Sequence, residues 1–522
     1  LMIQYTPSKQ QTLEEFKHPF HQKMKKDNLW VVLAELIPWY ELAEIYARNL
    51  NPKAGRLSVD IRMVIGALII KHKLSLSDPD TVEMISENMY MQYFCGLRTV
   101  QTELPIDASL FVDMRKRMGS ERFDEFNEIV IRRSEKLKPK RKRIIKGDDE
   151  GQNQGGKSSR RGSPSFQVKG QKKDIPNQGK LKLDASIADQ YVTAPNDVKL
   201  VNRAREETER LVDVLYQKGS FDPKPRTYRR NARKEYLSLA KKRNKNKQEI
   251  RVMLGKQLRY LRRNLSTIEK MLDKVEPQTG GRFPLNKRDQ RIYWVVQHVF
   301  DQQMYMYQNK VHSCSDRIVN IYQPHVRPMV RGKDRANVEF GSKINISEVE
   351  GFVRCDHLGW DNYDEGADLK LQVERFRQTY GCYPELLLGD RKYLTRENRR
   401  YLKEHGIRIV GKPLGRPPKE KLSGYKKYKT RKEQNMRNHV EGKFGQGKNG
   451  YGLNMIRARR QDTSESWISA ILFVMNLTKL MKVALKHGYF LALTIWIYIR
   501  RISRLTGTKY YLPGPSMKMA LE

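Results

Sequence analysis

The sequence has few cysteines, few acidic residues relative to basic ones, and no apolar run long enough to cross a bilayer. Four cysteines stand far apart, at Cys95, Cys314, Cys355 and Cys382. This scatter excludes a disulfide framework and a CxxC zinc site, and it favours a reducing compartment. The longest apolar run, Tyr489–Ile499, is shorter than the roughly 20 residues that span a membrane. The first residues also lack the apolar core of a signal peptide, so we expect a cytoplasmic protein without a membrane partner.

The shortage of acidic residues leaves a large positive charge. Lys and Arg total 101 against 59 Asp and Glu, which gives a formal net charge of +42 and a pI near 10.0 over 522 residues. Such a balance argues against an ordinary metabolic enzyme and indicates a polyanionic partner, nucleic acid first and an anionic membrane second. The length allows roughly two to four domains.

The front of the chain predicts a helical domain followed by a linker. Apolar residues recur at helical spacing through residues 1–135, which is typical of a DNA-binding or dimerisation domain, although helix packing alone gives the same pattern. Residues 136–180 are rich in Gly, Ser, Lys and Arg, and we interpret them as a basic flexible linker. Two roles stay open for this linker, a solvated spacer or a contact with the DNA backbone.

The remainder predicts an α/β domain with a helical insertion. We assign residues 181–204 and 311–484 to the α/β domain, residues 205–310 to the insertion, and residues 485–522 to a tail. The insertion carries a heptad seam along which two long antiparallel helices are expected to pack; its residues are Leu254, Leu258, Leu261, Leu265, Ile268 and Leu272. Two roles are possible for the helix surface that faces away from this seam: it could contact DNA phosphates, or it could simply face solvent. The high density of Arg and Lys favours contact with phosphates.

The order of elements in the α/β domain places three carboxylates. The first strand has apolar residues at 181, 183, 185 and 187 and carries Asp184 on its other face. Strands are expected at 317–322, 338–347 and 351–357, then a helix over 366–380. A buried strand, ELLLG, ends at Asp390, and after a helix over 395–404 and a strand over 406–410, a helix over 431–444 carries Glu441. This order matches a ribonuclease-H-like mixed sheet with flanking helices, in which these three positions converge.

Convergent carboxylates suit phosphodiester chemistry. Hard divalent cations prefer oxygen ligands, so Asp and Glu serve where His and Cys do not. Two Mg²⁺ ions about 3.5–4 Å apart activate an attacking water and stabilise the leaving oxygen. We therefore expect Asp184, Asp390 and Glu441 to hold two Mg²⁺ ions, for which Mn²⁺ could substitute.

Several other polar residues are alternative candidates for metal ligands. Asp189 competes with Asp184 for the first position but is expected to follow the strand and cap a turn. A second group is expected to serve as loop and cap carboxylates: Asp356, Asp361, Asp364 and Asp368. A third group has a loose metal-like spacing without a fourth partner, so a structural role is favoured for it: His312, Cys314 and His325.

The string RNHVEGKFGQGK surrounds the third carboxylate. Arg437 lies four residues before Glu441 and shares its helix face, and Lys448 shares that face only if the helix persists through the intervening glycines. An Arg and a Lys beside a metal-binding Glu are suited to hold phosphates. Arg457 and Arg459 extend the basic track. Taken alone, the string also fits the solvated end of a basic helix.

These residues resemble the DDE transposases of bacterial insertion sequences. The Arg-x3-Glu-x6-Lys pattern around Glu441, the segment LDASIADQYVTAPND around Asp184 and the segment LLLGDRKYL around Asp390 are similar to the family's three motifs. The front helical segment resembles the InsH-type domain of such proteins. The resemblance covers most of residues 1–135 and 181–484.

The resemblance implies a transposase that binds terminal inverted repeats and target DNA as a homodimer or larger assembly near the nucleoid. It implies catalytic roles for the three carboxylates, and DNA contacts by Arg437, Lys448, Lys343 on the GSKINIS strand, Tyr393, Arg457 and Arg459. Two alternatives remain: an inactive DNA-binding protein of a decayed element, and a structure-specific nuclease on the same fold.

Overall fold

The front of the chain is helical. The computed structural model describes residues 24–48, 50, 58–103, 106–137, 176–193, 195–219, 221–275, 283–330, 338–410 and 423–506, with backbone alone at 426, 487 and 489–506. Its first helices are α1 Leu29–Leu36, α2 Trp39–Ala47, α3 Ile61–Leu74, α4 Asp78–Glu87, α5 Met89–Phe94 and α6 Leu110–Leu137. Helix α3 is buried on almost every side, and at the start of α4 Ser77 and Asp80 form a reciprocal capping box.

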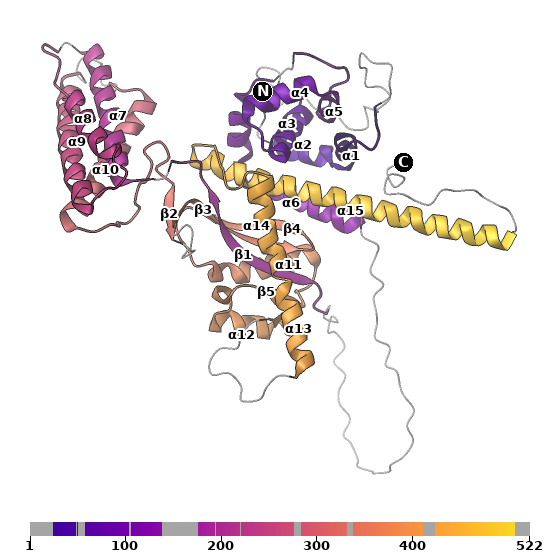
Figure 1. Cartoon of the computed structure of the whole chain (residues 1–522). Helices are drawn as coiled ribbons and strands as arrows, with labels where there is room; N and C mark the ends of the chain where they lie inside the picture. Colours follow the sequence, from indigo (N-terminus) through magenta and orange to yellow (C-terminus); the bar gives the residue numbers. More distant parts are fainter. Residues whose placement is uncertain are drawn as a thin grey trace, which may run out of the picture.

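A long helix joins this front unit to the rest of the molecule. Helix α15, Gln461–Thr506, runs beside α6, and the Phe126 and Phe473 rings lie 5.2 Å apart between them (Figure 1). The helix therefore continues past residue 484 into the segment that was assigned to a separate tail. By length and composition, Gln461–Lys486 could cross a membrane, but 67% of its apolar window is buried inside the protein, as in the core helix of a folded domain.

A six-stranded mixed sheet forms the centre. Its strands are β1 Lys180–Asp189, β2 Arg327–Val330, β3 Val338–Val349, β4 Phe352–Gly359, β5 Leu386–Leu388 and β6 Arg408–Ile409. Strand β3 pairs antiparallel with β1 on one side and with β2 and β4 on the other, while β1, β5 and β6 are parallel. The strand expected over 317–322 is wrong, because that segment has no regular structure and β2 begins only at Arg327.

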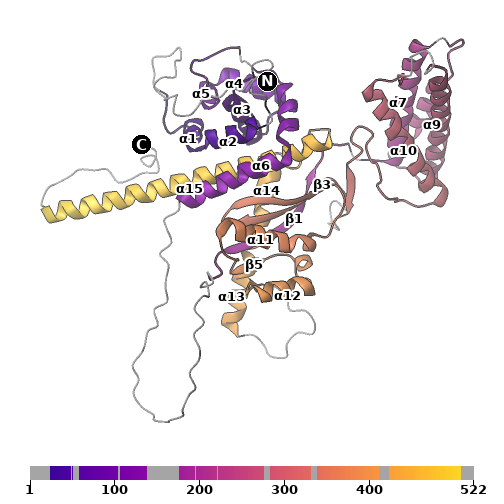
Figure 2. The ribbon, with the colours of Figure 1, turned by 180° about the vertical axis from the view of Figure 1, so that it is seen from behind.

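Helices cover both faces of the sheet. One face packs on α11 Leu369–Tyr380 and α12 Arg396–Glu404, through a core that includes Leu181, Leu183 and Phe376. The other face packs on α14 Asn438–Gly450 and α15, which Figure 2 shows from behind. The single helix expected over 431–444 is instead two helices, α13 Gly424–Asn435 and α14, which a turn at 436–437 separates.

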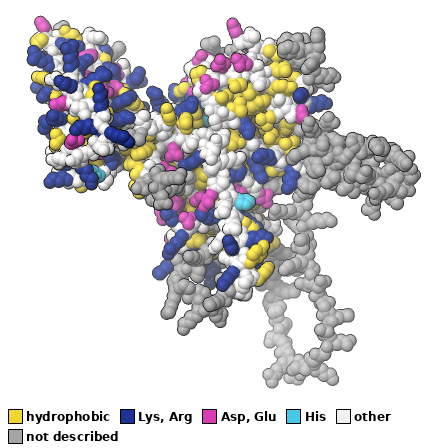
Figure 3. Space-filling view, viewed as in Figure 1, with side chains coloured by type: hydrophobic (Ala, Val, Ile, Leu, Met, Phe, Trp, Pro, Cys, Tyr) yellow, Lys and Arg dark blue, Asp and Glu magenta, His cyan; other side chains and the backbone are white. Residues whose placement is uncertain are grey.

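The insertion is a four-helix unit beside the sheet. Its helices are α7 Asp197–Lys218, α8 Arg229–Ala240, α9 Lys247–Val275 and α10 Lys287–Asn309. The heptad seam of α9 packs on α7 as well as on α10, so the expected two-helix hairpin is incomplete. The expected boundary at 204/205 falls inside α7. Lys and Arg side chains cover much of the visible surface of this unit (Figure 3).

Candidate functional site

Asp184 lies on β1, and Asp390 lies just past the end of the neighbouring parallel strand β5. The register of β1 and β5 pairs Lys180 with Leu386 and Lys182 with Leu388. Asp184 is two residues beyond Lys182 along β1, and Asp390 is two residues beyond Leu388, where β5 ends. Neighbouring strands are about 4.8 Å apart, so the register places the backbones of the two aspartates near each other. Asp390 is exposed and caps the short 3-10 turn Arg391–Tyr393, accepting a hydrogen bond from the Arg391 N–H.

The third carboxylate reaches this place from α14. The even-numbered face of β1 carries Asp184 and lies under α14, which bears Glu441 on its first turn. Arg437 immediately precedes α14 and connects two of the acids: one of its nitrogens lies 4.0 Å from the Asp184 carboxylate, and the other donates to Glu441. The expectation that Arg437 and Glu441 share a helix face is confirmed by this contact.

Lys448 sits further along the same helix. Despite its glycines, α14 persists to Gly450, so Lys448 remains on the helix that bears Glu441. Its ammonium lies 3.0 Å from the Asp189 carboxylate. Asp189 is the last residue of β1 rather than a turn residue beyond it, which corrects the expectation for this side chain. The Lys448–Asp189 pair fixes the far end of α14 to the far end of β1.

The donor set was tested for its fit to divalent cations. Among the described residues, no group of three or more His, Cys, Asp or Glu side chains is close enough together to hold a metal ion. At the candidate site, two of the three carboxylates instead share the Arg437 guanidinium, which supplies the positive charge that close carboxylates require. The set still fits hard cations, because it is made of oxygen donors alone, and Arg437 and Glu441 are partly exposed.

Two of the residues expected to contact DNA, Lys343 and Tyr393, are buried, which argues against a direct contact. Lys343 pairs in register with Ile187, so it lies on the opposite face of the sheet from Asp184. Its ammonium is 2.7 Å from the Tyr363 carbonyl and 3.4 Å from the Glu365 carboxylate, and the residue is 9% exposed. Tyr393 is fully buried in the core beneath α11 and donates its hydroxyl to Asn345. The sequence pattern gave no sign of this burial because both residues are polar.

Arg457 and Arg459 are exposed on the loop that follows α14. Their segment joins the sheet through an isolated parallel bridge between Gln190 and Ile456. Both arginines line a cavity together with residues of the insertion. The insertion residues of this cavity, Arg203 and Arg288, were missed by the sequence analysis, because only the tertiary structure brings them beside the last motif.

The carboxylates that were expected to serve in loops and caps have structural partners. Asp364 accepts a hydrogen bond from the Gly366 N–H as an N-cap, as expected. Asp356 is buried on β4 and pairs with Arg375, and Asp368 pairs with His357. The four cysteines are free thiols.

Comparisons with known proteins identify the class. Residues 387–478 match the family described as "Transposase DDE domain", and residues 18–117 match "Transposase domain (DUF772)". The chain thus matches two transposase domain families, in agreement with the resemblance to the DDE transposases of insertion sequences. The DDE match includes Asp390 and Glu441 but not Asp184. Proteins with such a domain act on DNA, and divalent metal ions are typical of them.

A curated relative matches at the level of sequence. "Uncharacterized protein ORF8 in nfe locus" of Rhizobium meliloti is 40% identical to this chain over 95 residues. The match covers 18% of this chain and 45% of that protein, so the chain spans less than half of the relative's length. No solved structure matches the chain.

Proposed function

We propose that this chain is the transposase of a bacterial insertion sequence, which binds terminal inverted repeats and catalyses metal-dependent DNA cleavage and strand transfer. The proposed catalytic residues are Asp184, Asp390 and Glu441. The observation that carries the proposal is their arrangement: matching register positions on β1 and just past the end of β5 for the two aspartates, and one arginine shared by Asp184 and Glu441.

The proposed fold of the catalytic unit is ribonuclease-H-like. The strand order β4-β3-β1-β5-β6, with helices on both faces and a helical insertion between β1 and β2, supports it. The front helices and the basic linker would bind or pair DNA ends, and a homodimer or larger assembly would hold two ends together. We place the protein in the cytoplasm, associated with the nucleoid.

The proposed reaction has two phosphoryl transfers. Water first cleaves a phosphodiester at the element's end and frees a 3′-hydroxyl, and this hydroxyl then attacks target DNA. Two Mg²⁺ ions held by the three carboxylates would lower the pKa of the attacking oxygen and stabilise the leaving one. Arg437 would release Asp184 and Glu441 and contact a phosphate near the scissile bond. Lys448, Arg457 and Arg459 would hold phosphates further along the strand.

The proposal is tested by isosteric substitution of the carboxylates. Asp184→Asn, Asp390→Asn and Glu441→Gln each remove one anionic ligand while keeping size. Each is expected to lower Mg²⁺-dependent cleavage of end-containing DNA by at least about 10³-fold, with repeat binding in EDTA nearly unchanged. Cleavage that survives each substitution would contradict the site. Cleavage without strand transfer would favour the nuclease, and wild-type binding without cleavage would favour an inactive DNA-binding protein.

A further inference from the structure

A groove separates the core from the insertion. It has a volume of about 610 Å³ and is bounded by the segment that follows β1, the loop that follows α14, and the insertion with its exit segment. The residues that line it are Tyr191, Val192, Thr193, Arg203, Arg288, Asn320, Tyr322, Gln323, Arg457 and Arg459. These segments are far apart in sequence, so the groove exists only in the folded chain.

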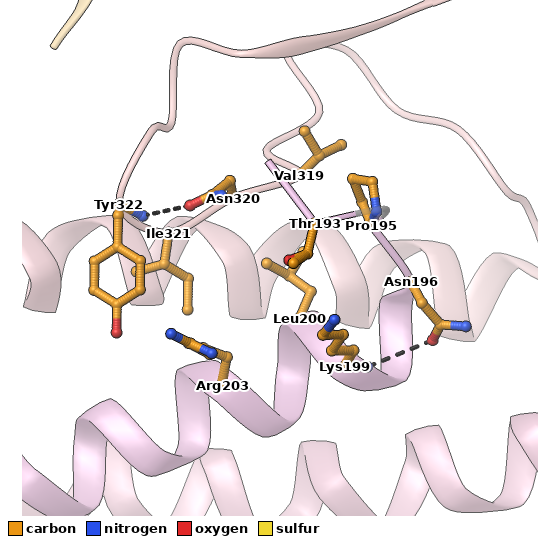
Figure 4. A pocket seen from close by; sticks show the side chains of 10 residues that line it. All are labelled: Thr193, Pro195, Asn196, Lys199, Leu200, Arg203, Val319, Asn320, Ile321 and Tyr322. Carbon is orange, nitrogen blue, oxygen red and sulfur yellow. Dashed lines mark hydrogen bonds between the residues drawn. The ribbon is translucent and has the colours of Figure 1, made fainter. Parts of the chain in front are cut away.

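The lining is strongly basic. Arg203, Arg288, Arg457 and Arg459 are all exposed, and the described lining includes no Asp or Glu. The Arg203 guanidinium lies over the Tyr322 ring at 5.4 Å, and the Tyr322 hydroxyl donates to Glu207. Figure 4 shows Arg203 and Tyr322 side by side in the small cavity that adjoins the groove. This contact orients the Arg203 guanidinium, and a fixed guanidinium is suited to bind a phosphate through two parallel hydrogen bonds.

Two further features suit a nucleobase. The Tyr191 side chain is 67% exposed, which is unusual for a large aromatic residue beside a buried strand. Gln323 is 6% exposed, and its Oε1 has no hydrogen-bond partner among the described residues. A buried acceptor without a donor costs free energy, and the amino group of a base would supply that donor. An exposed aromatic face beside arginines is the usual platform for single-stranded nucleic acid.

The groove lies on a path that leads away from the carboxylates. Asp184 and Tyr191 are seven residues apart along β1 and its continuation, or roughly 23 Å at about 3.3 Å per residue. This distance equals roughly seven nucleotide steps of B-form DNA. The Lys448–Asp189 pair stands between the two places. One strand can therefore reach from the groove to the carboxylates.

We propose that this groove binds an unpaired stretch of DNA adjoining the cleavage site, with phosphates on the arginines, a base on the Tyr191 ring and a base amino group on Gln323. The inference deepens the proposed function, on which it rests for the identity of DNA as the substrate. Stacking on Tyr191 and donation to the buried Gln323 oxygen both require a base that is not paired and stacked in a duplex. The groove therefore selects separated bases over a duplex.

The test uses the full chain with Asp184→Asn in EDTA at one fixed salt concentration. The probes are a fluorescein-labelled deoxycytidine homopolymer, whose bases carry the amino group that Gln323 would accept, and a random-sequence duplex of the same length. Tyr191→Ala is expected to weaken binding of the homopolymer by about tenfold and binding of the duplex by less than about twofold. Tyr191→Phe keeps the stacking face and is expected to bind both probes as the parent does.

Arg233→Ala is the matched control, because Arg233 is exposed on α8 and does not line the groove. This variant is expected to weaken binding of both probes by the same small factor. The inference is overturned if Tyr191→Ala weakens binding of both probes equally or weakens binding of neither. Failure of the proposed function looks different: Mg²⁺-dependent cleavage by the wild-type chain would be absent, while the selective effect of Tyr191→Ala would remain.

Discussion

Arg437 is central to the candidate site, because it contacts two of the three carboxylates. Binding of divalent cations by Asp184 and Glu441 requires that Arg437 leave. Arg437→Gln removes this competitor, so Mg²⁺ is expected to raise the melting temperature more in the variant than in the wild type. Without Mg²⁺ the variant is expected to melt lower, because the carboxylates then repel each other. Thermal unfolding with and without MgCl₂ measures both effects, and equal Mg²⁺-induced shifts would contradict the competition.

Lys343 is expected to affect stability rather than DNA binding. Its buried ammonium lies 3.4 Å from the carboxylate of Glu365, which is 7% exposed and also pairs with Lys392 at 3.1 Å. Lys343→Met removes one of these two lysines, together with the hydrogen bond to the Tyr363 carbonyl, and is expected to lower the free energy of unfolding by about 2 kcal/mol. Urea unfolding measures this loss. Under native conditions the salt dependence of DNA affinity should not change, and a loss of affinity at unchanged stability would restore Lys343 as a DNA contact.

At the scale of elements, α14 combines Glu441, a proposed catalytic residue, with glycines that weaken the helix. Gly442 and Gly445 have open space where a Cβ would stand, so packing does not explain them. Gly442→Ala is expected to raise the free energy of unfolding by about 0.5–1 kcal/mol. It is also expected to weaken DNA binding, because the bare backbone there allows close approach of a phosphate chain.

Gly447 provides the comparison within the same helix. A Cβ at Gly447 would lie 3.0 Å from Leu453, so Gly447→Ala is expected to destabilise the protein. Urea unfolding and fluorescence anisotropy with duplex DNA would separate the two positions. Gly442→Ala that stabilises the chain without weakening DNA binding would show that this face of α14 does not approach DNA.

At the scale of the whole molecule, the packing of the front helices on the core is expected to depend on pH. Asp124 on α6 lines a cavity of about 310 Å³ with Arg354 and Arg375 of the core. Burial raises the pKa of Asp124 to about 7, more than the nearby Arg375 lowers it. The folded chain thus binds this proton more tightly than the unfolded chain, and the free energy of unfolding falls as pH rises from about 4 to about 7.

Asp124→Asn removes this titration. The loss of stability between pH 5 and pH 8 is expected to be smaller in the variant by at least about 1 kcal/mol. Urea unfolding of the full chain at the two pH values measures the difference. The same pH dependence in both proteins would show that Asp124 does not titrate in this range.

The sequence by itself determined several local elements and supplied the proposal for the three acids. The alternation at 181–187, the buried run before Asp390 and the heptad seam of α9 each gave a correct element, because period and burial are local properties. The motif around Glu441 predicted the contact with Arg437, since residues four apart on a helix meet regardless of context. Composition alone indicated a polyanionic partner.

Only the tertiary structure decided which polar residues face the site. Lys343 and Tyr393 appeared to be surface residues, yet strand register turns one to the far face of the sheet and core packing buries the other. The continuation of α15, the role of α7 in the insertion and the groove beside Tyr191 likewise depend on contacts between segments far apart in sequence. Such contacts are set by burial and register across the whole chain, so no local pattern carries them.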